Sequence, residues 1–322
     1  MRLPGNPKMS FHDCQLFCRV MISKTVMSVR FLKDLRRRFR RPLKRILTLL
    51  FKDRVYVARS GLARGLKVTG DLGFLGKAPS RRNRFLTSLS MAQKTVYDVG
   101  SISVTTLFFS RAVGQTGQVI AFQPNPETFA ILRRNVEMNG LTNVRLVNIR
   151  LGERRQSMPV VFHGADDVWG TAVEGTQAAT FPETRATRVE AYSLDEYGRD
   201  ASLPPPDFLR IDAEGCEHSV LLGMQGILQR SRPDLLVEVH GEAHVRLENL
   251  RKIVELFLAY EYDIREMHSG RQIADVGQIR SPRHLFCKPK ARVVQTADPM
   301  AIALPGKGRL GMSENPPERA GD

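Results

Sequence analysis

Short apolar runs alternate with segments of helical periodicity through the middle of the chain. The runs predict strands at 95–99, 118–123, 144–148, 207–212, 235–239, 261–265 and 285–288. The periodic segments predict helices at 104–113, 126–139, 217–229 and 246–259, and residues 159–163 and 187–192 look extended. Strands that alternate with helices favour parallel pairing through right-handed crossovers. The pattern therefore predicts an α/β fold with a doubly wound, mostly parallel sheet, because there are too few repeats for a closed barrel.

The two ends of the chain differ from this series. Residues 27–51 place apolar side chains every three or four positions and fill the other faces with Arg and Lys, which predicts a basic amphipathic helix that Pro42 kinks. Residues 289–322 combine prolines and glycines with little periodicity. We therefore expect four parts, namely a basic, helical N-terminal extension (1–60), a linker or lead-in (61–91), the α/β domain (92–290) and a disordered tail (291–322).

The positive charge of the chain is concentrated at its beginning. The formal net charge is +16, and residues 1–60 contain 16 Lys and Arg against 3 Asp, so the remaining body is close to neutral. An enzyme of nucleic acids more often carries basic residues around its cleft, which argues against a nucleic-acid partner. The helix at 27–51 has three interpretations, which are docking on an anionic membrane surface, packing on the domain, and a nucleic-acid or targeting role.

The cysteines and the hydropathy pattern indicate where the protein resides. Four cysteines in 322 residues are too few for a disulfide scaffold. The sequence contains no run of about 18 apolar residues, so it predicts no transmembrane helix. The N-terminus has no clean signal-peptide pattern. We expect a cytoplasmic protein, with residues 27–51 as the candidate segment for peripheral attachment to a membrane.

Polar residues follow the apolar runs where four predicted strands end. These strand ends are Asp98–Gly100, Gln123–Asn125, Asp212–Gly215 and Glu238–His240. Ligands of doubly wound sheets bind at the carboxyl ends of the strands. The first turn has one glycine, Gly100, and lacks the glycine pattern of dinucleotide-binding proteins, which argues against NAD or FAD. Asp98 suits an ammonium group, such as the one at the methionine end of S-adenosylmethionine.

Several blocks of this sequence resemble the FkbM family of methyltransferases. The resemblance covers about residues 92–290, and it implies the Rossmann-like fold of class I methyltransferases, S-adenosylmethionine as cofactor, and methyl transfer to an oxygen. The acceptor is typically a hydroxyl of a sugar, a lipid or a secondary metabolite. The blocks are Tyr97–Gly100, Val119–Glu127, Arg133–Asn135, Asn139–Val144, Leu194–Asp195, Leu209–Glu217 and Pro233–His240.

Two positions of the expected cofactor site, one in the first loop and one at the end of the second strand, depart from the family pattern. Ser103 stands where the family has a second glycine, and Gln123 replaces a glutamate that would bind the ribose hydroxyls. A relative that has lost activity and serves membrane or partner binding is therefore the alternative function. The residues expected to contact the cofactor are Asp98, Gly100, Ser101, Ser103, Gln123 and Asn125.

The ends of the later strands carry the candidate catalytic groups. We expect Asp212 to orient the substrate or accept a proton, and His240 to act as a general base, since a neutral imidazole has a suitable basicity near pH 7. Glu238 is expected to be a hydrogen-bonding carboxylate, and the helix dipole explains Glu217. The group Asp212, Glu238 and His240 has ligand types that suit a divalent ion. No tight spacing demands one, so the sequence predicts no metal.

Overall fold

The structure is a computed structural model that describes residues 54–70, 80–161, 171–172 and 187–291. The predicted helix at 27–51 and the tail from residue 292 lie outside these residues, so the four predicted parts of the chain stay predictions. Within the lead-in, β1 (Tyr56–Val57) and β2 (Lys67–Val68) form an antiparallel pair that precedes helix α3 (Arg81–Ser88). Among the described helices, none combines the length and apolar character needed to cross a membrane.

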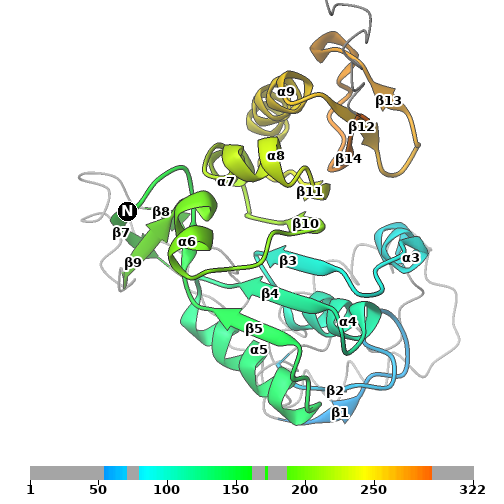
Figure 1. Cartoon of the computed structure of the whole chain (residues 1–322), viewed down its shortest axis with the longest axis vertical. Coiled ribbons are helices and arrows are strands. Elements are labelled where there is room, and N and C mark those ends of the chain that lie inside the picture. Colours follow the sequence, from blue (N-terminus) through cyan, green and yellow to red (C-terminus); the bar gives the residue numbers. More distant parts are fainter. Residues whose placement is uncertain (1–53, 71–79, 162–170, 173–186, 292–322) are drawn as a thin grey trace, which may run out of the picture. The chain divides into compact units, whose positions relative to one another are not determined.

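An eight-stranded sheet forms the centre of the described chain (Figure 1). Its order is β13-β12-β14-β11-β10-β3-β4-β5, and the pairs from β11 through β10, β3 and β4 to β5 are all parallel. This confirms the doubly wound, mostly parallel sheet. The strands are β3 (Thr95–Val99), β4 (Gln118–Phe122), β5 (Val144–Val147), β10 (Phe208–Ile211), β11 (Asp234–Glu238), β12 (Tyr262–Glu266), β13 (Gln272–Ile273) and β14 (His284–Pro289).

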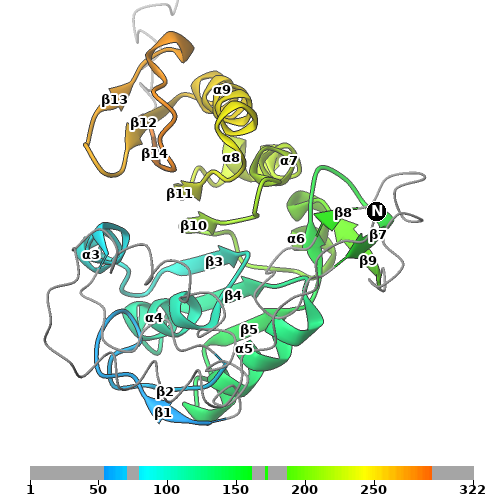
Figure 2. The same ribbon diagram turned by 180° about the vertical axis from the view of Figure 1, so that it is seen from behind.

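Helices cover both faces of this sheet (Figure 2). On one face, Phe109 of α4 (Ser103–Val113) packs with Val96 and Phe208, and α3 and α5 (Pro126–Met138) lie on this side. On the other face, Leu221 packs with Val99. That layer holds α6 (Leu194–Asp200), α7 (Glu217–Leu222), α8 (Gln225–Arg230) and α9 (Ala243–Ala259), and the 3-10 turn η2 (Val276–Gln278) packs on α9. Successive strand residues point to opposite faces, so these strands are apolar on both sides.

The strand order reverses between β3 and β10. The chain runs from β3 through β4 to β5 in one direction, and from β10 to β11 in the other. In the parallel register Val99 lies opposite Ile211, and Ile211 lies opposite Val237. Because parallel strands end at one edge, the residues that follow them meet there, which makes this edge the switch point where such sheets bind ligands.

A smaller sheet follows β5. Its strands are β6 (Arg150–Leu151), β7 (Gln156–Val161), β8 (Thr171–Ala172) and β9 (Thr187–Tyr192), in the order β6-β9-β7-β8. β9 has the bounds expected from the sequence, and β7 overlaps the predicted extended segment and begins three residues before it.

The helix predicted at 217–229 is two helices, α7 and α8, which are separated at Gly223 and Met224. The cause lies in another part of the chain. A Cβ on Gly223 would lie 1.9 Å from the carbonyl oxygen of Gly152, so the backbones touch there. Asp195 of α6 then accepts the amide hydrogens of Gly226 and Ile227 at 2.6 and 2.9 Å, which caps the second helix at its start.

Candidate functional site

A buried arginine joins the ends of two strands. Arg210 of β10 lies opposite Asp98 of β3, and its Nη1 donates to Asp98 Oδ1 at 2.8 Å. Its Nη2 donates to Asp212 Oδ2. Burial alone would lower the pKa of Arg210, but the charges of Asp212 and Asp98 outweigh burial and hold that pKa above its ordinary value. The three side chains form an ion triad inside the protein.

Both oxygens of the Asp98 carboxylate accept hydrogen bonds from protein donors. Besides Arg210, the hydroxyls of Thr105 and Thr106 donate to Asp98 Oδ2 at 3.0 and 2.8 Å, and Asp98 is fully buried. In this structure the carboxylate binds protein donors and presents no surface to a ligand. Its contact with a cofactor ammonium therefore stays a prediction, while its contacts here hold the first turn of α4 against β10.

Gly100 brings the loop after β3 into contact with the end of β10. Its φ is +71°, and a Cβ at this position would lie 1.8 Å from the carbonyl oxygen of Asp212. Only glycine fits both constraints. The amides of Gly100 and Ser101 both donate to the carbonyl oxygen of Phe122 at 3.1 Å, so the loop also packs against the end of β4.

Gln123 closes the same loop from the end of β4. Its Nε2 donates to the carbonyl oxygen of Ser101 at 2.7 Å, and its Oε1 accepts the amide hydrogen of Asn125 at 2.8 Å. Gln123 is fully buried, and Ser101 places its hydroxyl against that of Thr106. Asn125 is also buried, and its side chain accepts the amide hydrogens of Glu127 and Thr128, which caps α5.

Ser103 differs from the other predicted cofactor residues because it is partly exposed. It begins α4, and its hydroxyl accepts a hydrogen bond from Asn135 Nδ2 at 2.9 Å. Asn135 also bonds the backbone of Thr69 in the lead-in. The structure thus brings all the predicted cofactor residues to one edge, where the side chains of Asp98, Ser101, Gln123 and Asn125 are buried and bonded within the protein.

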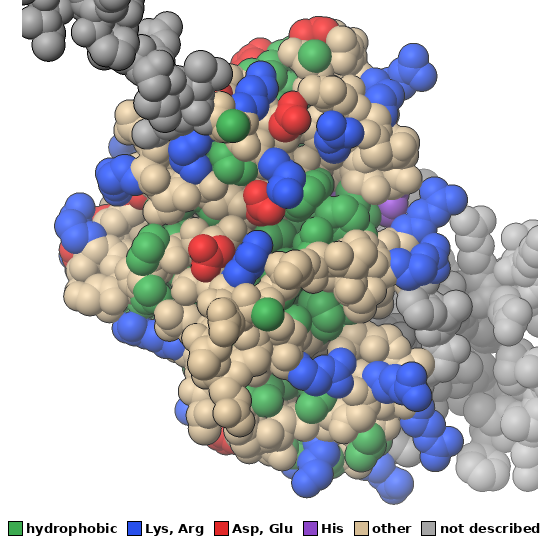
Figure 3. All heavy atoms as spheres, turned by 45° about the vertical axis from the view of Figure 1, so that its right-hand side comes forward, with side chains coloured by type: hydrophobic (Ala, Val, Ile, Leu, Met, Phe, Trp, Pro, Cys, Tyr) green, Lys and Arg blue, Asp and Glu red, His purple; other side chains and the backbone are tan. Residues whose placement is uncertain are grey.

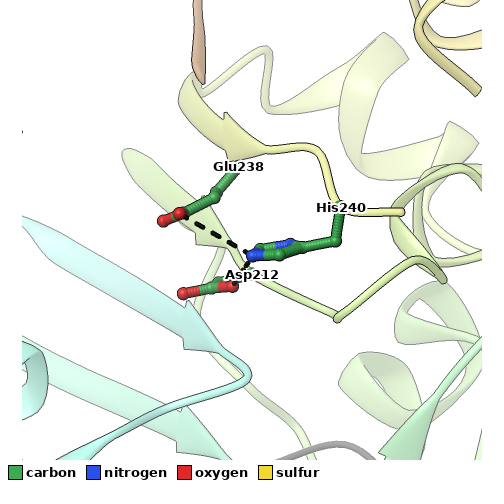
Figure 4. A group of neighbouring side chains, drawn as sticks. All are labelled: Asp212, Glu238 and His240. Carbon is green, nitrogen blue, oxygen red and sulfur yellow. Dashed lines mark ion pairs between the residues drawn. The ribbon is translucent and has the colours of Figure 1, made fainter. Parts of the chain in front are cut away.

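The predicted catalytic residues lie next to this loop. His240 points between Asp212 and Glu238, as Figure 4 shows. Its Nε2 lies 3.5 Å from Asp212 Oδ1 and 3.7 Å from Glu238 Oε1. Asp212 is 9% exposed, and its Oδ1 is a buried oxygen that makes no hydrogen bond to any described residue. The ends of β10 and β11 therefore converge on one point with three groups that can accept protons or bind a cation.

Each of these three side chains has a further partner at its other oxygen or nitrogen atom. Arg210 bonds Asp212 through the other oxygen, Oδ2. Arg82 of α3 donates to Glu238 Oε2 at 2.9 Å, and His284 Nε2 lies 3.2 Å from the same oxygen. His240 Nδ1 lies 3.1 Å from Oε1 of the fully buried Glu217, which also accepts the amide hydrogen of Gly215 at 2.9 Å. The second nitrogen of His240 is thereby directed at the two carboxylates.

The surrounding charges set the protonation of the cluster. Burial would lower the pKa of His240, but the hydrogen bond to Glu217 and the charges of Asp212 and Glu214 raise it to about 9. Burial raises the pKa of Asp212 although Arg210 opposes the shift. At neutral pH these surroundings favour an imidazolium at position 240, whereas the sequence analysis expected a neutral imidazole.

No role was predicted for Arg210 or Arg82, and the role predicted for Glu217 was a different one. A signal for Arg210 was present, since a charged residue within the apolar run of β10 needs a buried counter-charge. Glu217 was assigned to the helix dipole, and its contact with His240 depends on how α7 packs beside β11. Arg82 had no signal, because its partner Glu238 lies 156 residues away.

Residues 90–264, more than half of the chain, match the family described as "Methyltransferase FkbM domain". "Methyltransferase 1" of Beauveria bassiana is 27% identical over 139 residues, which cover 39% of this chain and 55% of that protein. "Hexuronic acid methyltransferase AglP" of Haloferax volcanii is 28% identical over 158 residues, which cover 49% of this chain and 61% of that protein. The matches therefore span less than two thirds of these curated relatives.

A solved structure of methyltransferase FkbM from Methylobacillus flagellatus also matches this chain. The sequence identity is 17% and the TM-score is 0.41, with 62% of this chain and 44% of that chain covered.

Proposed function

Because the chain belongs to the FkbM methyltransferase family, we propose that it transfers a methyl group from S-adenosylmethionine to a hydroxyl of a sugar, a lipid or a secondary metabolite. When bound, the cofactor supplies an electrophilic methyl group on a sulfonium. The protein has to hold the acceptor hydroxyl in line with that methyl group and remove the hydroxyl proton.

Asp212 Oδ1 is the observation that carries this proposal. It is buried, makes no hydrogen bond to a described residue, and belongs to the residue whose carbonyl touches Gly100 in the predicted cofactor loop. A carboxylate oxygen in this position can accept the hydroxyl proton or a hydrogen bond from the hydroxyl. Arg210 on Oδ2 fixes the orientation of this carboxylate. His240 is its neighbour and can pass a proton on to solvent, since 16% of its side chain is exposed.

One feature of this edge bears on S-adenosylmethionine. Gly100 lets the loop after β3 lie directly against the end of β10, which brings that loop to the switch point where ligands of this fold bind. Ser103 is partly exposed, and the cofactor would contact it together with the backbone around it. Asp98 and Gln123 would contact the cofactor only by exchanging a present partner for it.

The acceptor is proposed to be a small molecule. The Haloferax relative is named for hexuronic acid, so sugars that include hexuronic acids are the first acceptors to test. On the face shown in Figure 3, Lys and Arg side chains are spread over the whole surface and do not form one stripe. This arrangement gives no support for a nucleic-acid substrate. Docking of residues 27–51 on an anionic membrane stays a prediction from the sequence.

A second candidate function is a family member with weak or lost methyl transfer. The internal hydrogen bonds of Gln123 favour this second candidate. The side-chain amide bonds the backbone of Ser101 and Asn125, so the ribose of the cofactor would have no charged acceptor there. Replacing a charged acceptor by a neutral one weakens binding by about tenfold.

Titration calorimetry of the full chain with S-adenosylmethionine and with its demethylated product separates the two candidates. Micromolar binding of both supports the enzyme, and the Asp212→Asn variant should then keep cofactor affinity within about threefold while methyl transfer in an acceptor screen falls by about 100-fold or more. Asp234→Asn is the matched control, since Asp234 begins the neighbouring strand at the opposite edge of the sheet. No binding at millimolar cofactor would refute the enzyme and favour the second candidate.

A further inference from the structure

Three ligand-type atoms converge at the ends of β10 and β11. His240 Nε2, Asp212 Oδ1 and Glu238 Oε1 come from residues whose ligand atoms all lie within 4.8 Å of one another. In a tetrahedral site with bonds of about 2.1 Å, the ligand atoms lie about 3.4 Å apart. The separations of His240 Nε2 from Asp212 Oδ1 and from Glu238 Oε1, 3.5 and 3.7 Å, are close to that value.

The hydrogen-bond partners of these three side chains are of the kind that orient metal ligands. A histidine that binds a metal through one nitrogen usually donates its other N–H to a carboxylate, which fixes the tautomer. Glu217 Oε1 does this for His240 Nδ1 at 3.1 Å. Likewise Arg210 and Arg82 take the outer oxygens of Asp212 and Glu238, so each carboxylate turns its remaining oxygen towards His240 Nε2.

One oxygen in this group makes no hydrogen bond to a described residue. Asp212 Oδ1 is buried, and Asp212 as a whole is only 9% exposed. A buried carboxylate oxygen without a donor costs free energy that a bound cation would recover. Figure 4 shows the imidazole of His240 pointing at Asp212 and at Glu238, and an ion placed between the three side chains would contact all of them.

We propose that Asp212, Glu238 and His240 bind one divalent transition-metal ion, such as Zn²⁺ or Mn²⁺. One imidazole and two carboxylates suit such ions better than Mg²⁺ or Ca²⁺, which prefer oxygen ligands. Three protein ligands leave coordination positions open, as in catalytic sites. This departs from the sequence-based expectation of no metal. If the proposed methyl transfer is correct, an open position of the ion would hold the acceptor hydroxyl. The ion would then replace Asp212 Oδ1 as the group that eases the loss of the hydroxyl proton, which leaves to solvent.

Metal binding is measured on the full chain after treatment with a chelator and without any cofactor. Titration calorimetry with ZnCl₂ or MnCl₂ should show one equivalent bound in the micromolar range or tighter. His240→Asn and Glu238→Gln should each weaken binding by at least about 100-fold, and Glu217→Gln by about 10- to 100-fold. The matched controls are His244→Asn and Glu248→Gln, because both residues are exposed on α9, and both should bind metal as the natural chain does.

Cobalt spectroscopy of the natural chain tests the site without any variant. Co²⁺ added to the metal-free protein should give d–d absorption bands of a nitrogen and oxygen ligand set, and Zn²⁺ should remove them. A thiolate-to-cobalt charge-transfer band would place the ion on a cysteine and overturn the proposal. Absence of binding, or binding that His240→Asn leaves unchanged in a folded variant, would also overturn it.

The cofactor titration is then repeated on the metal-free protein. Metal binding without cofactor binding would retain this site and refute the proposed methyl transfer. Cofactor binding without metal binding would retain the proposed methyl transfer and refute the metal site.

Discussion

Replacement of Arg210 by methionine tests the buried ion triad most directly. Methionine has a similar length and keeps the apolar part of the packing, but it removes the charge and the donors to Asp98 and Asp212. Asp98 is fully buried and Asp212 is 9% exposed, so both carboxylates would remain inside the protein without their cation. Breaking a buried pair in this way costs about 3–5 kcal/mol. Since the free energy of unfolding of a domain is about 5–15 kcal/mol, the loss should be easy to measure.

The assay is urea unfolding of the natural chain and the variant, followed by circular dichroism at pH 7 and pH 5. The destabilisation should be about 3–5 kcal/mol at pH 7 and smaller at pH 5, because burial raises the pKa of Asp212 and, without the opposing charge of Arg210, this carboxyl is more readily neutralised by protonation. The double variant Asp98→Asn with Arg210→Met should recover at least about 1 kcal/mol, since one of the two uncompensated charges is gone. A loss below about 1 kcal/mol at pH 7, or an equal loss at both pH values, would refute this reasoning.

Three further predictions concern the same edge of the sheet. Gly100→Ala should destabilise the fold by about 3 kcal/mol or more in thermal unfolding, because its Cβ would lie 1.8 Å from a carbonyl oxygen. Gly140 also has a positive φ, +61°, but open space around it, so Gly140→Ala should cost only about 1 kcal/mol. Equal losses of stability in the two variants would contradict the packing argument. Gln123→Glu should lower stability by about 1–3 kcal/mol, because the carboxylate cannot donate to Ser101, and a variant that binds cofactor more tightly at unchanged stability would contradict this. In metal-free protein the pKa of His240 is raised from 6.5 to about 9, so protonated His240 stabilises the fold. This stabilisation is complete below about pH 6.5 and is lost as the pH rises through 9. The urea midpoints at pH 7 and pH 9.5 should therefore differ more in the natural chain than in His240→Asn.

The order of strands and helices was predictable because it depends on local patterns. The bounds of β3 and the start of α5 at Pro126 follow from residues that are neighbours in the sequence. The parallel arrangement followed from alternation alone. The placement of the polar strand ends at one edge followed in turn from parallel pairing.

What the sequence did not predict depends on contacts between distant segments. The break between α7 and α8 arises where Gly223 meets the backbone of Gly152. The use of Gln123 as a bridge between Ser101 and Asn125 could not be separated from a role in binding ribose, since either role needs a polar residue at the end of β4. The contact between His240 and Glu217 was not predicted either, because it joins the end of β11 to a helix 23 residues earlier in the sequence.

The position of β14 has a consequence for how the protein is made. β14 is the last strand in the described chain, yet it lies between β11 and β12, and it brings His284 to Glu238. During translation β11 and β12 leave the ribosome before the strand that fills the space between them, so the nascent sheet has two unpaired edges until residue 289 emerges. A premature stop just before this strand would therefore leave an aggregation-prone chain, although every helix of the described residues would be present.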